Sequence, residues 1–266
     1  MRLAWINEKG GTLKTTLATH SAVYLAAFMG EPTLLIDMDP QGQAGKCLGF
    51  TADGSDATTR DVLAGETKIA QAAIATGIDG LQLLRSDKSL ALGSDQLARR
   101  SDGHKILRSA LAGQRQWAHV VIDSPPSIGF LTRNILAAAT DVCIPVNLSY
   151  LSLDGAAELV RTVEQAREEL DNRSLRVFRV VPTLYRQTRL AQAVLDKLQE
   201  NFGSRCANTR IGISVKVDEA QSWGQTIWEY APSSPAAVNF LMLMAELFGA
   251  PRRDGYAILR ARKRQG

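Results

Sequence analysis

The stretch 9–16, KGGTLKTT, combines residue types that are suited to holding phosphate groups. An apolar run at 3–6 precedes it and an apolar-periodic segment begins near Leu17, so the stretch reads as the loop between a strand and a helix. In such a loop the backbone N–H groups surround the phosphates, a lysine contacts the β- and γ-oxygens, and a hydroxyl holds Mg²⁺. Lys14 and Thr15 have the types and the spacing for the last two roles.

This loop departs from the pattern G-x-x-x-x-G-K-[ST], because Glu8 and Leu13 stand at the two glycine positions. Leu13 bears on the chemistry, since the glycine that it replaces can adopt a positive φ, which costs a residue with a Cβ about 1–3 kcal/mol. Strain of that size would weaken nucleotide binding by about one or two powers of ten without abolishing it. The rate of hydrolysis is more sensitive to this strain than binding is, because a small misplacement of the γ-phosphate can lower the rate about a hundredfold.

Carboxylates follow two apolar runs that read as buried strands. The run 33–36 leads into Asp37 and Asp39, and the run 119–122 leads into Asp123. A single aspartate after a strand is more often a turn residue or a helix cap. Open α/β sheets, however, bind ligands at the carboxyl ends of their strands, so two such strands beside a phosphate loop predict one shared nucleotide site.

These motifs together resemble those of the ParA/Soj/MinD ATPases, whose deviant Walker A loop reads K-G-G-x-x-K-T-T. The strings D-x-D-P-Q-G at 37–42 and D-x-P-P-S at 123–127 resemble the second Walker A element and the Walker B strand of that family. The segment 141–155 resembles the strand and loop after Walker B, and 219–227 resembles the segment E-A-P-S-x-G-x-x-I. The resemblance, closest to the ParA/Soj branch, covers roughly residues 1–250.

The resemblance implies ATP and Mg²⁺ as ligands. Nucleotide would be bound by Lys9, Gly10, Gly11, Thr12, Leu13, Lys14, Thr15 and Thr16. Lys14 would neutralise the phosphates, and Lys9 would cross to the nucleotide of the second subunit in an ATP-bound homodimer. Thr15 and Asp123 would hold the metal, with Asp37 near it, and Asp39 would orient or activate the attacking water.

Apolar runs separated by helical patterns predict strands near 3–7, 33–37, 80–84, 119–123, 141–146, 177–183 and 207–211. This alternation predicts an α/β fold, a mostly parallel doubly wound sheet covered by helices on both faces. The resemblance implies that the fold is of the P-loop NTPase type. Residues 51–64, rich in Asp, Gly, Ser and Thr, interrupt the pattern. We expect a surface loop there, either responsive to nucleotide or a solvated connection.

Length and composition agree with a single ATPase domain over 1–250, since 266 residues with 45% hydrophobic side chains can bury a full core. The three cysteines, Cys47, Cys143 and Cys206, lie far apart, so neither a disulfide framework nor a zinc site is expected and a cytoplasmic location is favoured. No apolar run approaches the roughly eighteen residues of a membrane span.

The basic excess lies at the end of the chain. The formal net charge is +4, and six basic residues against one aspartate give the tail 251–266 a charge of +5, which leaves −1 for the rest. Such a tail suits the phosphates of DNA or of anionic lipid, or it is a solvated terminus. Its bulky apolar residues Tyr256, Ile258 and Leu259 are nearly contiguous, unlike those of a membrane-binding helix, so DNA is the favoured partner.

Lys216 falls where the Soj-like segment carries a DNA-contacting arginine. Lysine keeps the charge and loses the bidentate fork, which a phosphate contact tolerates. We expect the same DNA surface to include Arg186, Arg189, Arg210, Arg252 and Arg253. For each of these residues taken singly, and for Lys216, a solvated surface charge is the better explanation.

The resemblance therefore implies a dimerising ATPase that binds DNA nonspecifically and segregates or positions DNA or other cargo on the nucleoid. A ParB-like or cargo-adaptor protein would set its timing. Two alternatives stay open: a MinD-like ATPase of the membrane surface, and a nucleotide-binding protein whose hydrolysis Leu13 impairs. Gly212 and Ile213 stand where Soj-like chains have Pro-Arg beside the adenine, which leaves the selectivity for adenine open.

Overall fold

The computed structural model describes residues 1–54, 56–149 and 152–263. Within them the chain forms a seven-stranded sheet in the order β3-β4-β2-β5-β1-β6-β7. The strands are β1 (Arg2–Trp5), β2 (Thr33–Asp37), β3 (Ile74–Ala75), β4 (Leu81–Leu84), β5 (His119–Asp123), β6 (Asp141–Asn147) and β7 (Arg176–Thr183). Every pairing is parallel except that of β3 with β4. The predicted doubly wound, mostly parallel sheet is confirmed.

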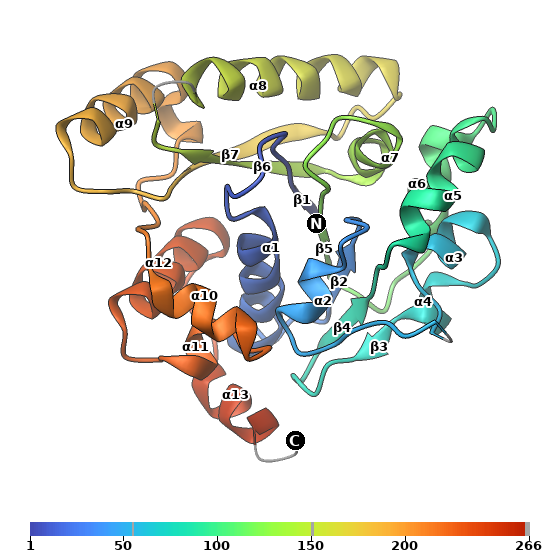
Figure 1. The fold of residues 1–266 in the computed structure, drawn as a ribbon, viewed down its shortest axis with the longest axis horizontal. Coiled ribbons are helices and arrows are strands. Elements are labelled where there is room, and N and C mark those ends of the chain that lie inside the picture. Colours follow the sequence, from blue (N-terminus) through green and yellow to red (C-terminus); the bar gives the residue numbers. More distant parts are fainter. Residues whose placement is uncertain (55, 150–151, 264–266) are drawn as a thin grey trace.

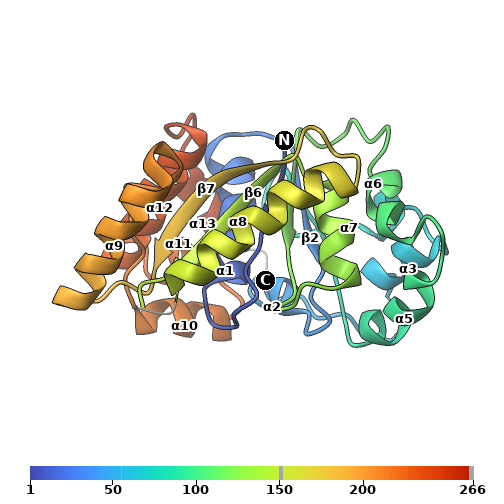
Figure 2. The same ribbon diagram turned by 90° about the horizontal axis from the view of Figure 1, so that it is seen from above.

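Helices cover both faces of this sheet (Figure 1). The helices α7, α8 and α9 lie above it in that view, and α1 and α10 to α13 lie below it. Figure 2 shows α8 running across β6 and β7. The bounds are α1 (Lys14–Val23), continued by the π-helical turn η1 (Tyr24–Phe28), α2 (Gln43–Lys46), α3 (Thr59–Ala64), α4 (Ile69–Ala72), α5 (Ser89–Ala98), α6 (Ile106–Ala110), α7 (Phe130–Ala138), α8 (Ser152–Glu169), α9 (Arg189–Phe202), α10 (Val215–Ser222), α11 (Ile227–Tyr230), α12 (Pro235–Phe248) and α13 (Gly255–Lys263), with 3₁₀ turns η2 (Gly103–Lys105) and η3 (Gly203–Arg205).

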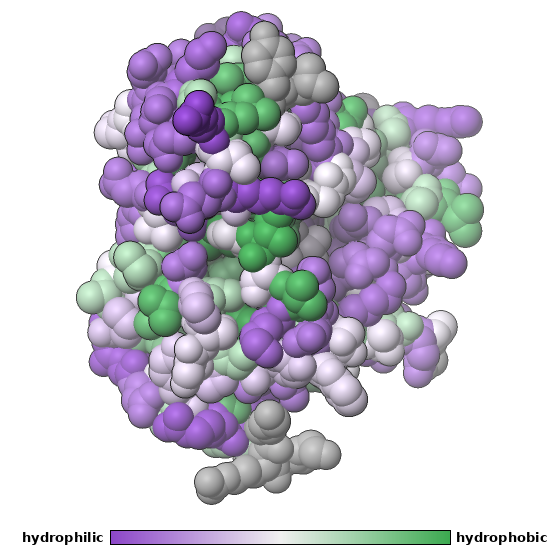
Figure 3. Space-filling view, turned by 60° about the vertical axis from the view of Figure 1, so that its left-hand side comes forward, coloured by the Kyte–Doolittle hydropathy of each residue, from purple (hydrophilic) through white to green (hydrophobic). Residues whose placement is uncertain are grey.

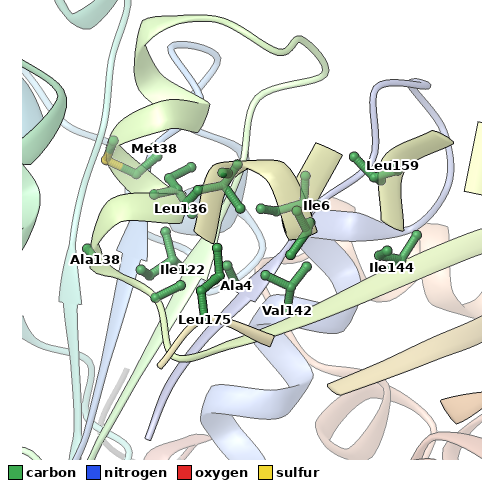
Figure 4. Packing of buried hydrophobic residues seen from close by; sticks show 14 of the residues in the cluster. Ala4, Ile6, Met38, Ile122, Leu136, Ala138, Val142, Ile144, Leu159 and Leu175 are labelled. Atoms are coloured by element: carbon green, nitrogen blue, oxygen red, sulfur yellow. The ribbon is translucent and has the colours of Figure 1, made fainter. Parts of the chain in front are cut away.

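Alternate residues of the buried strands point to opposite faces of the sheet and belong to two separate hydrophobic cores, as expected for strands covered on both faces. On one face Ala4 and Ile122 pack with Leu136 of α7 and Leu159 of α8 (Figure 4). On the other face the neighbours Leu3 and Trp5 pack against α1, α12 and α13. This two-sided burial fixes the strand ends, and with them the loops that carry the predicted site.

One predicted strand, 207–211, is wrong. The bridges of the described residues flank that segment, between Val180 and Cys206 and between Tyr185 and Gly212. Within it, only the N–H groups of its two end residues donate to β7. No strand forms there because the N–H groups of Asn208 and Thr209 donate to the Glu246 carboxylate, at 2.7 and 2.8 Å, instead of to a neighbouring strand. Pro182, which has no N–H, also interrupts the ladder on the β7 side.

The predicted surface loop at 51–64 is only partly correct, because its second half forms α3. Thr58 and Asp61 build a capping box, in which the Thr58 N–H donates to the Asp61 carboxylate at 2.7 Å. The T-x-x-D spacing therefore starts a helix where composition favoured a loop.

The C-terminal helix α13 packs on the body of the protein. Leu259 is buried, and the Tyr256 ring meets Phe28 of η1 edge-on with centroids 5.3 Å apart. No helix in the described part of the chain is long and apolar enough to cross a bilayer. Residues 264–266, the end of the predicted basic tail, lie outside the described residues.

Candidate functional site: a nucleotide cavity at the carboxyl ends of the strands

A cavity of about 400 Å³ opens where β1, β2 and β5 end. This volume is in the usual range of small-molecule sites. The walls bring together much of the predicted site and further residues from distant parts of the chain: Gly10, Gly11, Thr12, Leu13, Lys14, Thr15, Thr16, Asp39, Gln43, Cys47, Pro126, Leu184, Asp218 and Gln221. The sequence motifs predicted the side of this cavity that the glycine-rich loop forms, but not the side that Leu184 and α10 form.

The glycine-rich loop holds itself in shape through the Lys9 carbonyl. The Lys14 ammonium donates to that oxygen at 3.0 Å and the Thr12 hydroxyl at 3.3 Å, while the Lys9 N–H donates to the Asn7 side chain at 2.9 Å. A Cβ added at Gly10 or Gly11 would meet no atom within 4 Å. The backbone here therefore faces open space, as a loop that surrounds a ligand requires.

Leu13 adopts the left-handed backbone conformation, with φ 69° and ψ 22°. A leucine in this region is strained by about 1–2 kcal/mol relative to a glycine. Its half-buried side chain packs against the core cluster under α1, and α1 begins at the next residue. The chain thus keeps the loop geometry of a glycine and bears the strain instead of reshaping the loop.

Three aspartates meet beside the loop. Asp37 and Asp123 are fully buried, and Asp39 is 8% exposed. Asp37 and Asp123 occupy paired positions of β2 and β5. Asp37 accepts the Asp39 N–H at 3.0 Å and two N–H groups of α2, at 2.9 and 3.4 Å, so it anchors the start of that helix.

Asp123 is the least satisfied of the three. Neither of its buried carboxylate oxygens has a hydrogen-bond partner of normal geometry among the described residues. Burial raises the pKa of Asp123 well above its usual range, and the charge of Asp37 raises it further, whereas the nearby Thr15 hydroxyl and Lys14 lower it. Burial likewise raises the pKa of Asp37 to about 7. The described residues contain no group of three acidic, histidine or cysteine side chains arranged to hold a metal ion. The two Asp123 oxygens without hydrogen bonds nevertheless suit a hard divalent cation, which prefers oxygen ligands.

Lys14 supplies the positive charge of the site. It is 7% exposed, and desolvation lowers its pKa while Asp123 and Asp39 raise it. A buried ammonium beside buried carboxylates is ordinarily retained for a purpose other than stability. Lys14 can hold an anion, and the neighbouring carboxylates can hold a cation beside it.

His20 connects the loop helix to α11. Its Nε2 accepts the Ile227 N–H at 3.1 Å, so Nδ1 carries the proton and donates to the Thr16 carbonyl at 2.7 Å. Burial lowers the pKa of His20 to about 4, which keeps the ring neutral. This histidine, absent from the predicted site, positions α1 and does not line the cavity.

The residues predicted to contact DNA fall into two groups. Arg210 stacks over Tyr185 at 4.3 Å, and the bridge between Tyr185 and Gly212 brings the segment with Arg186 and Arg189 beside the one that leads into Lys216 of α10. Arg186, Arg189 and Lys216 are exposed, and so are the apolar side chains near them in sequence, Leu190, Ile213 and Val215. Figure 3 shows a surface on which hydrophilic areas alternate with separate hydrophobic patches.

Arg252 and Arg253 lie elsewhere and are engaged with the chain itself. Arg252 pairs with Glu31 at 2.7 Å, and Arg253 pairs with Asp79 at 3.1 Å. Because Glu31 precedes β2, this group lies at the amino ends of the strands, opposite the cavity. The structure therefore does not bring Arg252 and Arg253 together with Lys216.

A glycine-rich loop between a strand and a helix, with aspartates at the ends of the two neighbouring strands, defines a P-loop nucleotide-binding protein. The model of a family described as "AAA domain" matches residues 2–177. The chain is 35% identical over 254 residues to the chromosome partitioning protein ParA of Caulobacter vibrioides, covering 94% of each. It is 38% identical over 247 residues to the chromosome-partitioning ATPase Soj of Thermus thermophilus, covering 92% of this chain and 94% of Soj.

A solved structure of cobyrinic acid a,c-diamide synthase from Mycobacterium smegmatis, with a bound ATP analog and magnesium, is 31% identical, with a TM-score of 0.73 over 84% of this chain and 91% of that one. The chain belongs to the ParA/Soj family of partitioning ATPases.

Proposed function

We propose that this protein dimerises with ATP, binds DNA nonspecifically and uses ATP hydrolysis to segregate or position DNA or other cargo. The observation that carries the proposal is the cavity that Lys14, the open glycine loop and Asp39 line, with the buried Asp123 carboxylate beside Thr15 and Lys14. Its relatives are named as partitioning ATPases, and the synthase with the same fold binds an ATP analog with magnesium.

The loop would hold the phosphates of ATP. The backbone N–H groups around Gly10 and Gly11 surround them, and the Lys14 ammonium neutralises their charge. Thr15 and Asp123 would hold Mg²⁺ with Asp37 beside it, and the bound ion supplies positive charge against carboxylates and phosphates. Asp39, at the wall of the same cavity, orients the attacking water and accepts its proton.

Lys9 would act between subunits. It lies exposed at the start of the loop, whereas the Lys14 side chain is buried and folded back onto the Lys9 carbonyl. In the proposed homodimer the Lys9 ammonium reaches the phosphates held by the partner subunit. ATP then contributes to the interface itself, and loss of the γ-phosphate on hydrolysis separates the subunits.

The DNA surface would be the group around α10, formed by Lys216, Arg186, Arg189 and Arg210. All four are basic and close to the nucleotide cavity, and in a dimer they occur twice. Phosphate contacts of this kind give affinity without sequence preference. Lys216 lies 3.9 Å from the Glu219 carboxylate, just as Arg252 and Arg253 face carboxylates. Arg252 and Arg253 would form only a separate patch, because they lie at the opposite ends of the strands. A ParB-like or cargo-adaptor protein would time hydrolysis, and the ATP-bound protein would associate with the nucleoid.

Salt dependence of duplex binding tests this surface. With Asp39→Ala, chosen to slow hydrolysis, and Mg-ATP present, log affinity should fall against log salt with a slope of about −0.9 per phosphate contact, whatever the sequence. Lys216→Ala should reduce the slope by about one per protomer. Lys88→Ala, an exposed lysine at the start of α5, is the matched control and should change nothing. Equal slopes for all three proteins would contradict the proposal.

Recruitment to anionic liposomes instead of DNA would favour the MinD-like alternative. The fold gives that alternative little support, because Leu259 and Tyr256 of α13 pack inward. A membrane-binding helix needs such residues on its outer face.

The strained Leu13 favours a second candidate function, a nucleotide-binding protein that hydrolyses ATP poorly. Turnover by Leu13→Gly separates the two candidates. A rise of about tenfold or more identifies Leu13 as the cause of weak hydrolysis, and unchanged turnover supports the first candidate.

A further inference from the structure

Gln221 of α10 reaches the glycine-rich loop. Its Nε2 donates a hydrogen bond to Thr16 Oγ1 at 2.5 Å, across 205 residues of sequence. Both side chains line the nucleotide cavity, and Thr16 is 5% exposed. In the segment that resembles E-A-P-S-x-G, Gln221 stands at the proline, so this contact is a feature of this chain.

We propose that Gln221 is a positioning residue that fixes the Thr16 hydroxyl as a hydrogen-bond donor to the bound nucleotide. A threonine hydroxyl has one proton to donate and two lone pairs to accept. Because the Gln221 amide occupies an accepting site, the proton of Thr16 is directed to an acceptor, and the phosphate oxygens of Mg-ATP are the acceptors that this cavity would hold. Without Gln221 the hydroxyl can turn back to a carbonyl of its own helix.

The C-terminal end of α10 is held firmly enough for this role. Val217 and Ala220 are buried, and a Cβ on Gly224 would lie 2.5 Å from Gly49 Cα, so the turn after α10 touches the loop after α2. His20 joins the following helix to α1 through the Ile227 N–H at 3.1 Å. Gln221 is therefore presented to Thr16 from a packed element, as precise positioning requires.

Substitutions at Gln221 should act on nucleotide affinity and not on folding. Gln221→Leu keeps the side-chain bulk and removes the amide, so Mg-ADP binding by titration calorimetry should weaken about three- to tenfold. Gln221→Glu should weaken it further, because a carboxylate accepts the hydrogen bond of the Thr16 hydroxyl and repels phosphate. Gln225→Leu, on a glutamine of the next turn that does not line the cavity, is the matched control.

A double-mutant cycle with Thr16 separates positioning from packing. In a Thr16→Val background, Gln221→Leu should cost no further affinity, whereas in Thr16→Ser, which keeps a hydroxyl, its full effect should remain. A structural role for Gln221 would instead lower the melting temperature of the nucleotide-free protein and leave the affinity ratio unchanged. The inference would be overturned if Gln221→Leu left the Mg-ADP affinity unaltered. It would also be overturned if Gln221→Leu lowered the affinity as much in the Thr16→Val background as in the wild type.

This inference rests on the proposed nucleotide cavity but on neither dimerisation nor DNA binding. Mg-ADP is used as the probe because the proposed dimer requires ATP. Lys14→Ala tests the cavity itself and should abolish Mg-ADP binding. If Lys14→Ala binds normally, the nucleotide site is elsewhere, and if only Gln221→Leu binds normally, the site stands and the role of Gln221 is refuted.

Discussion

Asp37 and Asp123 lie side by side at the ends of β2 and β5, both fully buried, yet they are bonded in opposite ways. Asp37 accepts three backbone N–H groups. Asp123 accepts none of normal geometry from the described residues. The first carboxylate builds the start of α2. The second is desolvated without hydrogen bonds that compensate for burial, and only the nearby Lys14 ammonium and Thr15 hydroxyl favour its charged form.

Asp123→Asn should therefore stabilise the nucleotide-free protein while it destroys the activity. Removing a buried, unpaired charge is expected to raise the free energy of unfolding by about 0.5–2 kcal/mol. ATP turnover should fall at least about a hundredfold. Urea unfolding and a phosphate-release assay measure the two effects. A variant that is both less stable and inactive would show that Asp123 is needed for the fold.

The stability gap between Asp123→Asn and the wild type should widen with pH. The pKa of Asp123 in the folded protein is raised well above its usual value by burial. Below about pH 4 Asp123 is protonated in both the folded and the unfolded state, and the wild type has its full free energy of unfolding. As the pH rises through the folded pKa of Asp123, this carboxyl ionises at an unfavourable buried site and the free energy of unfolding falls. Unfolding curves at pH 4 and pH 8 check this, and a gap that shrinks toward pH 8 would reverse the sign of our argument.

Leu13→Gly should be more stable than Leu13→Ala. Both variants lose the packing of the leucine side chain, but only glycine relieves the positive φ of 69°. The expected difference in the free energy of unfolding is about 1 kcal/mol. Chemical denaturation of the two proteins measures it. Equal stability would mean that the loop bears no strain at this position.

Arg262→Ala should loosen α13. Arg262 pairs with Glu229 at 3.1 Å, their side chains are 15% and 4% exposed, and the guanidinium also donates to the Leu48 carbonyl. Removing one partner of such a pair leaves a buried charge, and we expect a loss of about 2–3 kcal/mol, somewhat below that of a fully buried pair.

Arg260→Ala is the control for this change, because its pair with Asp254 is exposed on both sides. It should alter the free energy of unfolding by less than about 0.5 kcal/mol. If the two variants melt alike, α13 is not anchored by Arg262.

The features read correctly from the sequence are those whose signals are local. The loop at 9–16 and the aspartates after β2 and β5 each lie next to the apolar run that positions them, so a few consecutive residues were enough. Six of the seven strands predicted from such apolar runs are strands in the structure. The exception is 207–211, where the Glu246 carboxylate, far along the chain, accepts the N–H groups of Asn208 and Thr209.

Contacts between distant segments could not be predicted. Gln221 and Leu184 reach the cavity only because α10 and the end of β7 fold over it. The charge of the tail favoured contacts with DNA phosphates, whereas Arg252, Arg253 and Arg262 each pair with a carboxylate from an earlier segment. Net charge locates basic residues along a chain but does not reveal whether the fold neutralises them.

In the proposed mechanism, ATP joins two subunits through Lys9. Light scattering of Asp39→Ala tests this dimerisation. We predict twice the monomer mass with Mg-ATP and the monomer mass with Mg-ADP. Lys9→Ala in the same background should bind Mg-ATP and remain a monomer. Equal mass with both nucleotides, or a normal ATP dimer without Lys9, would contradict the account.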